Sequence, residues 1–88
     1  MDRNEFMRRL RDEGFEQFVT VEREPNGALD EHTHPFEAEA LVIAGEILIE
    51  SGGVTQTVRA GETFHLAAGQ PHSERYGPEG VSYLVGRK

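Results

Sequence analysis

Two histidines, His32 and His34, stand one residue apart in the chain. In a β-strand, residues i and i+2 point to the same face about 7 Å apart, so two such imidazoles can converge on one ion, with each nitrogen ~2 Å from it. Pro35 ends the strand directly after this pair, and a third histidine, His72, also follows a proline at the start of a predicted strand. Strand ends at the mouth of a barrel are common places for ligand sites. The three histidines therefore indicate a metal site, although a pair of this spacing also occurs by chance on exposed strands.

The elements that position these side chains are short strands separated by turns. From residue 16 onward the apolar residues alternate with polar ones or form short runs, and glycine or proline follows every few residues. We expect strands near residues 16–23, 29–34, 39–43, 46–50, 55–59, 63–66, 72–76 and 82–85. Strands at this spacing predict a mostly β fold, a sandwich or a barrel, with the remainder of the chain as an appendage.

One short helix is predicted before the strands, over residues 4–13. Phe6, Met7 and Leu10 share one face of this helix. Asn4 is the expected N-cap, and Gly14 stands where a glycine commonly follows a helix. No linker or repeat divides the rest, so we expect an N-terminal helix in residues 1–14 and a single barrel domain in residues 15–88.

Composition argues against several classes of function. The formal net charge of -7 argues against a nucleic-acid partner, which requires a basic surface. The absence of cysteine excludes disulfides and thiolate-ligated metals. No apolar run approaches the roughly 20 residues that cross a bilayer, and the N-terminus is charged from its second residue. We therefore expect a soluble, cytoplasmic protein with no membrane partner.

A homodimer is the expected assembly. A chain of 88 residues lies near the lower end of what folds with an ordinary core. The continuous apolar runs at 41–43 and 47–49 need cover on both faces of the sheet. A second copy of the chain would supply that cover.

Two segments of the chain resemble the two sequence motifs of the cupins. The first segment carries the spaced residues Gly27, His32, His34, Glu39 and Gly45. The second spans residues 61–72 and carries glycines at 61 and 69 followed by His72, with alanine at 67 where the family usually has proline. The second segment is the more specific of the two, because its glycines, apolar pair and histidine all fall in register.

The resemblance implies both a fold and a cofactor. A cupin of this length is a small double-stranded β-helix, or jelly-roll barrel, and is commonly a single-domain homodimer. The family holds a divalent metal with two histidines and a glutamate of the first motif and a histidine of the second. These ligands would here be His32, His34, Glu39 and His72. Imidazoles suit Zn, Fe, Ni, Cu and Co, and a carboxylate shifts preference toward harder ions such as Mn, so the identity of the metal stays open.

The register of Glu39 has two readings. Glu39 follows His34 by five residues, as in the family, but Gly45 then comes one residue sooner than the family pattern. Aligning on Gly45 instead puts Ala38 at the ligand position and, by strand parity, turns Glu37 and Glu39 toward water or nearby arginines. Three histidines would remain, which is still a competent ligand set.

His65 is expected to stand apart from this set. It lies between Phe64 and Leu66, which occupy inward apolar positions of the second motif. Strand alternation therefore turns His65 to the opposite face, where a surface or interface role is expected.

The expected function is that of a metal-binding small cupin with an open barrel pocket for a small organic ligand. Three or four protein ligands leave a coordination position free for substrate, which allows a metal-dependent enzyme of the dioxygenase, isomerase or lyase type. A non-catalytic module that binds or senses a small molecule is the alternative, and a structural dimer with vestigial histidines is a third. Nothing in the residues selects among these, because a fold does not determine its chemistry.

Overall fold

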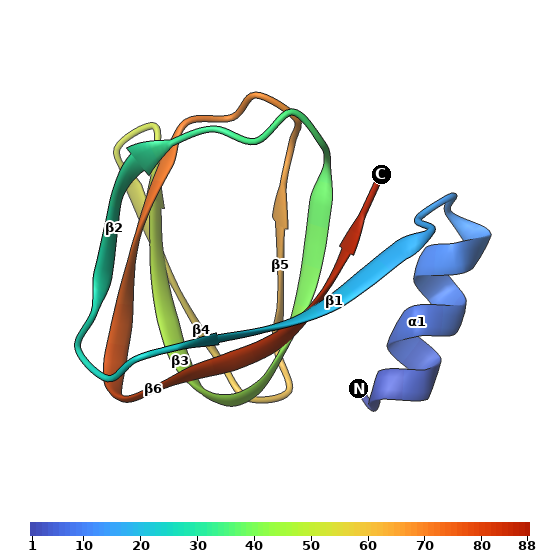
Figure 1. Cartoon of the computed structure of the whole chain (residues 1–88), viewed down its shortest axis with the longest axis horizontal. Helices are drawn as coiled ribbons and strands as arrows, with labels where there is room; N and C mark the ends of the chain where they lie inside the picture. Colours follow the sequence, from blue (N-terminus) through green and yellow to red (C-terminus); the bar gives the residue numbers. More distant parts are fainter.

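The computed structural model describes all residues from 1 to 88. One helix is followed by six strands: α1 (Arg3–Asp12), β1 (Gln17–Arg23), β2 (Ala28–His32), β3 (Ala38–Ser51), β4 (Val54–Arg59), β5 (Thr63–Leu66) and β6 (His72–Arg87). The strands hold 59% of the residues and curve into a barrel, with α1 outside it (Figure 1). The predicted fold, a mostly β barrel with one short N-terminal helix, is confirmed.

The helix begins one residue earlier than predicted, because Asp2 and not Asn4 is its N-cap. The Asp2 Oδ1 atom accepts a hydrogen bond from the Glu5 backbone N–H at 2.8 Å, the usual N-cap arrangement. At the other end, Gly14 has a φ of 95°, the left-handed conformation that favours glycine after a helix. α1 is neither long enough nor apolar enough to cross a bilayer.

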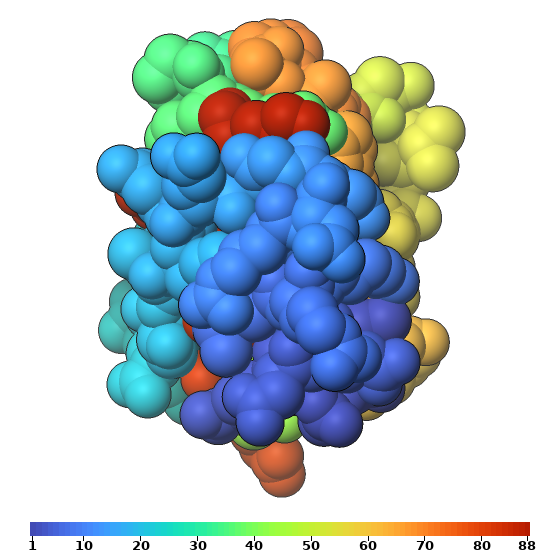
Figure 2. Space-filling view, turned by 90° about the vertical axis from the view of Figure 1, so that its right-hand side faces the viewer, coloured from blue at the N-terminus to red at the C-terminus, as the bar shows by residue number.

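The helix covers one side of the barrel. Its buried residues Phe6 and Leu10 pack with Phe15 against Leu41 of β3 and Leu84 of β6. Figure 2 shows this side of the molecule, with α1 across its middle and β1 beside it. The outer face of the apolar run at 41–43 is therefore covered within the chain at Leu41. The homodimer stays a prediction.

Two strands are far longer than predicted. The expected strands at 39–43 and 46–50 are both part of β3, and those at 72–76 and 82–85 are both part of β6. The expectation of separate short strands was wrong because Gly45 and residues 77–80 bend the chain without ending it. The pairing of β3 with β6 shifts register at these bends but continues beyond them. Gly45 has a φ of 74°, and a Cβ there would overlap the carbonyl oxygen of Gly80, so glycine is required where the two bends cross.

β3 and β6 pair with each other and are the central strands of the sheet. β1 and β2 pair with β6, and β4 and β5 pair with β3, all of them antiparallel. Twelve buried residues fill the interior. The connections 33–37 and 67–71 cross the same end of the barrel, at the top of Figure 1. His32, His34 and His72 all lie at this end of the barrel.

Candidate metal centre

The three histidines come together although they lie on separate parts of the chain. His32 ends β2 and stands opposite His72, the first residue of β6. The ring centroids of His32 and His72 are 4.3 Å apart, and His34 lies 5.0 Å from the first and 5.2 Å from the second. The structure thus groups the three predicted histidines, each of which can offer one nitrogen.

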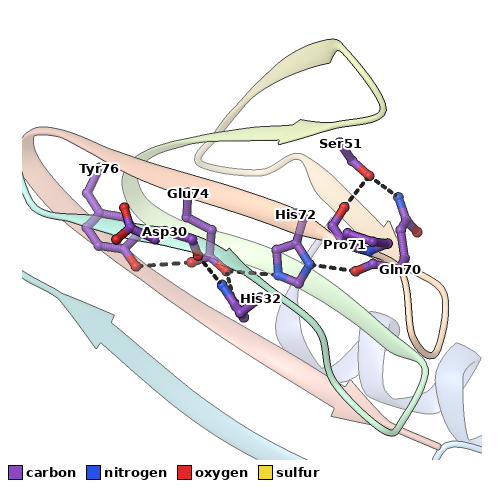
Figure 3. A network of polar contacts seen from close by, with 8 residues as sticks. All are labelled: Asp30, His32, Ser51, Gln70, Pro71, His72, Glu74 and Tyr76. Carbon is purple, nitrogen blue, oxygen red and sulfur yellow. Dashed lines mark hydrogen bonds and ion pairs between the residues drawn. The ribbon is translucent and has the colours of Figure 1, made fainter.

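The loop that follows β5 is held by its own hydrogen bonds, which place His72. The Gln70 side chain accepts from the Ala67 N–H at 2.9 Å and donates to the Ser51 hydroxyl at 2.9 Å. That hydroxyl donates to the carbonyl of Pro71 at 2.7 Å (Figure 3). The Gly69 N–H donates to the carbonyl of His34 at 2.8 Å, which ties the two connections together.

A carboxylate joins the histidines, and it comes from Glu74. Its Oε2 atom lies 3.2 Å from His72 Nε2 and 3.4 Å from His32 Nε2. The ligand atoms of Glu74 and the three histidines all lie within 4.8 Å of one another. Glu74 was not among the predicted ligands. The signal was present, since His72 and Glu74 are i and i+2 on one strand, the same relation that identified His32 and His34.

The structure does not bring Glu39 to the histidines. Its Oε2 atom accepts a hydrogen bond from Arg9 of α1 at 3.0 Å, on the outside of the barrel. Ala38 faces inward instead, as in the register aligned on Gly45, and lines the cavity beside the histidines. The reason is strand parity, because neighbouring residues of β3 face opposite sides of the sheet.

His65 lies on the outer face, as its strand alternation predicts. Its Nε2 atom is 2.7 Å from the Glu37 carboxylate, and both side chains are largely exposed. This hydrogen bond lowers the pKa of Glu37. The pair is a surface contact with no part in the histidine cluster.

Hydrogen bonds around the cluster orient its members. The Nδ1 atom of His32 is 2.7 Å from the carbonyl oxygen of Asp30, and that of His72 is 3.0 Å from the carbonyl oxygen of Gln70. The Tyr76 hydroxyl donates to Glu74 Oε1 at 3.0 Å (Figure 3). Partners of this kind fix the orientation of metal-binding side chains.

These contacts also decide which atoms face the centre. A carbonyl oxygen only accepts, so Nδ1 carries the ring proton in both His32 and His72 and Nε2 of the neutral ring is an acceptor. The carboxylate oxygens of Glu74 are acceptors when ionised. The two Nε2 atoms and this carboxylate are then all acceptors, an arrangement that a proton or a cation between them stabilises.

The environment of His34 favours its neutral form. Burial lowers the pKa of His34, and the nearby His32 and His72 lower it further. Its ring stacks on Phe36 with the centroids 5.0 Å apart. The pKa of Tyr76 is raised, first by burial and then by the Glu74 carboxylate, so its hydroxyl keeps the proton that it donates.

A cavity of about 80 Å³ opens beside the cluster. His32, His34 and Glu74 line it, together with mostly apolar side chains from the barrel interior. Hollows of about 410 and 430 Å³ on the surface contain none of the site histidines, although Glu74 also lines the first of them. The small cavity is therefore the one that a metal in the cluster would face.

Comparisons with solved structures support the barrel. A protein of unknown function from Rhizobium leguminosarum matches with a TM-score of 0.76 and 20% identity, over 80% of this chain and 66% of that one. A mutant of Bacillus subtilis oxalate decarboxylase matches with a TM-score of 0.71 and 22% identity, over 81% of this chain and 20% of that one. An oxalate oxidase in complex with the substrate analogue glycolate matches with a TM-score of 0.69 and 28% identity, over 80% of this chain and 40% of that one.

The chain spans less than two thirds of the length of these solved relatives, at 66% for the first and smaller shares of the other two. A comparison with functionally curated proteins finds no match. The model of the cupin domain family matches residues 19–84, most of the chain and both histidine motifs. With its barrel, its motifs and this match, the chain belongs to the cupin family.

Proposed function

We propose that this cupin binds a divalent transition metal through His32, His34, His72 and Glu74 and uses it to act on a small organic molecule in the adjoining cavity. The observation that carries the proposal is the convergence of four ligand atoms within 4.8 Å. In His32 and His72 the unprotonated Nε2 atoms face the centre of the cluster, and their lone pairs can bind a cation.

The ligand types limit which metal the site accepts. Three imidazoles and one carboxylate suit Fe, Mn, Ni, Co, Cu and Zn, whereas Mg and Ca prefer all-oxygen sites. Four protein ligands leave positions open for water or substrate in five- or six-coordinate geometry. The chemistry that such an ion would supply when bound is Lewis-acid polarisation of a substrate oxygen or activation of dioxygen.

Each residue of the chain has a distinct role in this proposal. The Asp30 and Gln70 carbonyls hold His32 and His72 in one tautomer, and the Tyr76 hydroxyl holds the Glu74 carboxylate. The apolar walls of the cavity keep bulk water from the reacting centre. The inner Tyr83 hydroxyl remains protonated, because burial and then Glu74 raise the pKa of Tyr83 to about 12.

The enzymatic form of the proposal is favoured over a binding or sensing module by one finding. Two of the similar structures are, by their names, an oxalate oxidase and an oxalate decarboxylase, and the first is 28% identical over 80% of this chain. Both names describe chemical conversion of a small acid. The same barrel in this chain supports catalysis, with substrate and reaction left to experiment.

The test begins with metal. Protein stripped with a chelator is titrated with Mn, Fe, Co, Ni, Zn and Cu, and we expect one equivalent to bind. The loaded forms are then incubated under air with oxalate, 1,3-dicarbonyls and catechols while oxygen uptake and substrate loss are followed. Turnover supports an enzyme, one equivalent of metal without turnover supports the binding module, and no stoichiometric metal contradicts the proposal.

A further inference from the structure

Two arginines line the cavity beside the metal centre. Arg23 and Arg87 contribute to its walls together with His32, His34 and Glu74. Two cationic side chains therefore face a single carboxylate in a space of about 80 Å³. The chain as a whole has 16 acidic and 9 basic residues. The cavity therefore has an excess of positive side chains in a protein whose net charge is negative.

The pairing of β1 with β6 directs both arginines inward. Arg23 stands opposite Val81, and Arg87 stands opposite Gln17. Val81 belongs to the interior cluster, as does Val85, two residues before Arg87. Because alternate residues of a strand share one face, Arg23 and Arg87 lie on the inner face at opposite ends of the β1–β6 ladder.

Neither arginine is neutralised by a carboxylate. None of the ion pairs in the structure includes Arg23 or Arg87. The Nε–H of Arg87 is buried and has no hydrogen-bond acceptor. A buried guanidinium N–H without an acceptor is costly to keep, so Arg87 suggests that an anion is supplied from outside the chain. Arg23 is exposed and carries no such cost.

Aromatic contacts connect Arg87 to the histidines. Its guanidinium carbon lies 4.7 Å from the centroid of Phe36, which stacks in turn on His34. Cation–π contact with a ring partly offsets the burial of the charge and fixes the plane of the guanidinium. The guanidinium of Arg87 is therefore linked to the histidine cluster by two successive ring contacts, first with Phe36 and then with His34.

We propose that the ligand of this cupin is a small organic acid whose carboxylate is held by Arg87 while its other polar end meets the metal centre, and that Arg23 adds positive charge from the far end of the ladder. This inference rests on the proposed function, since it names the substrate class for the same cavity. Planar guanidinium groups recognise carboxylates through paired, charge-assisted hydrogen bonds. The cavity is only about 80 Å³ in volume, so the ligand must be a small molecule.

The wild-type protein tests the charge requirement without any mutation. Zinc-loaded and metal-free protein, labelled with ¹⁵N, is titrated with glycolate, with malonate and with glycolamide, the neutral counterpart of glycolate. Calorimetry measures the dissociation constants, and NMR follows the arginine Nε–H signals. We expect glycolate to bind at least about tenfold more tightly than glycolamide and to shift the Arg87 Nε–H signal, because the amide loses the charge-assisted contacts.

Three variants identify the residues responsible. Arg87→Gln should weaken glycolate binding at least about tenfold and leave glycolamide binding unchanged. Arg23→Gln should weaken glycolate binding less, because Arg23 is exposed at the far end of the ladder. Arg87→Lys keeps the charge without the paired donors, so it should fall between Arg87→Gln and the parent. The matched control is Arg75→Gln, since Arg75 lies on the same strand but is exposed on the outer face and should have no effect.

The outcomes separate this inference from the function on which it rests. If zinc binds stoichiometrically but glycolate and glycolamide bind alike, the acid specificity is wrong and the metal site stands. If Arg87→Gln binds glycolate as tightly as the parent does, Arg87 is not the carboxylate site. If zinc fails to bind while glycolate still shifts the Arg87 signal, the metal function is wrong and the anion site stands.

Discussion

Two glutamates follow the site histidines along the chain, and only one of them reaches the site. Glu39 lies five residues after His34 on β3, and Glu74 lies two residues after His72 on β6. The Glu39 side chain leaves the barrel to meet Arg9, whereas the Glu74 side chain is 7% exposed and contacts two histidines. The comparison teaches that strand parity decides which carboxylate is available, more than distance along the sequence does.

The two histidine–glutamate pairs differ in whether the alternation of side chains along a strand can be counted from one residue to the other. His72 and Glu74 belong to one continuous strand, so their common face follows directly from alternation. His34 and Glu39 are separated by the connection 33–37, which is not a strand and includes Pro35. Alternation cannot be carried across such a turn, so a spacing rule applied there can miss by one residue.

The largest effect is expected from His72→Ala, which tests whether the β6 side of the site holds the metal. His72 is 1% exposed, contacts the Glu74 carboxylate and stands opposite His32. Loss of an outer-shell partner alone typically costs 10–100-fold in affinity, so loss of a ligand should cost about 100-fold or more. Competition with a chelating dye measures this. His65→Ala is the matched control and should change affinity less than twofold, and equal affinity for His72→Ala and the parent would exclude His72 as a ligand.

A second pair of variants tests the comparison directly. Glu74→Gln should weaken metal binding at least about tenfold, because it replaces an anionic oxygen ligand in the cluster. Glu39→Gln should leave affinity unchanged, since its contact is with Arg9 on the outside. The same dye competition applies to both. The opposite result, with loss at Glu39 and none at Glu74, would restore the four-ligand set that the family motif implies.

A smaller effect is expected from Tyr76→Phe. This change removes the hydroxyl that donates to Glu74 Oε1 at 3.0 Å and keeps the ring that fills the core. We expect about tenfold weaker metal binding, the low end for an outer-shell partner, with a circular dichroism spectrum like that of the parent. If affinity is unchanged, the tyrosine packs against Glu74 without orienting it.

The mildest perturbation is a change of pH. Metal binding requires neutral imidazoles, so occupancy should fall as the pH drops below about 6. His34 should contribute least to this loss, because burial and the neighbouring His32 and His72 lower its pKa and a proton competes there only at lower pH. Occupancy measured by dialysis at pH 7, 6 and 5 checks the expectation. Occupancy that is flat over this range would argue against histidine ligands.

Much of the fold could be predicted from the chain, and the failures have a common cause. The strand at 63–66 was predicted to the residue, since glycines at 61 and 69 mark the turns on either side of its apolar residues. The strands joined at Gly45 and at residues 77–80 were missed because glycine also permits a bend within a strand. Local sequence shows that the backbone can turn there, but the pairing of β3 with β6 decides that it continues.

The candidate site also has some residues that the sequence predicts and others that only the folded structure reveals. The three histidines were predicted from motif spacing, and Glu74 could have been found by applying to residues 72–74 the parity used for 32–34. The carbonyls of Asp30 and Gln70 could not have been predicted, because every residue has a carbonyl and only tertiary packing selects two of them. The arginines of the cavity were missed for a related reason, since they reach it through the register of β1 on β6.

The strand that carries His32 is also one of the least secured parts of the barrel. β2 pairs with β6 alone, its register shifts along the ladder, and four of its five residues are exposed. An ion shared by His32 of this edge strand and by His72 and Glu74 of β6 would act as a clasp between them. Release of the ion and detachment of the strand would then be one event, so the residence time of the metal would be set by how often an edge strand frays.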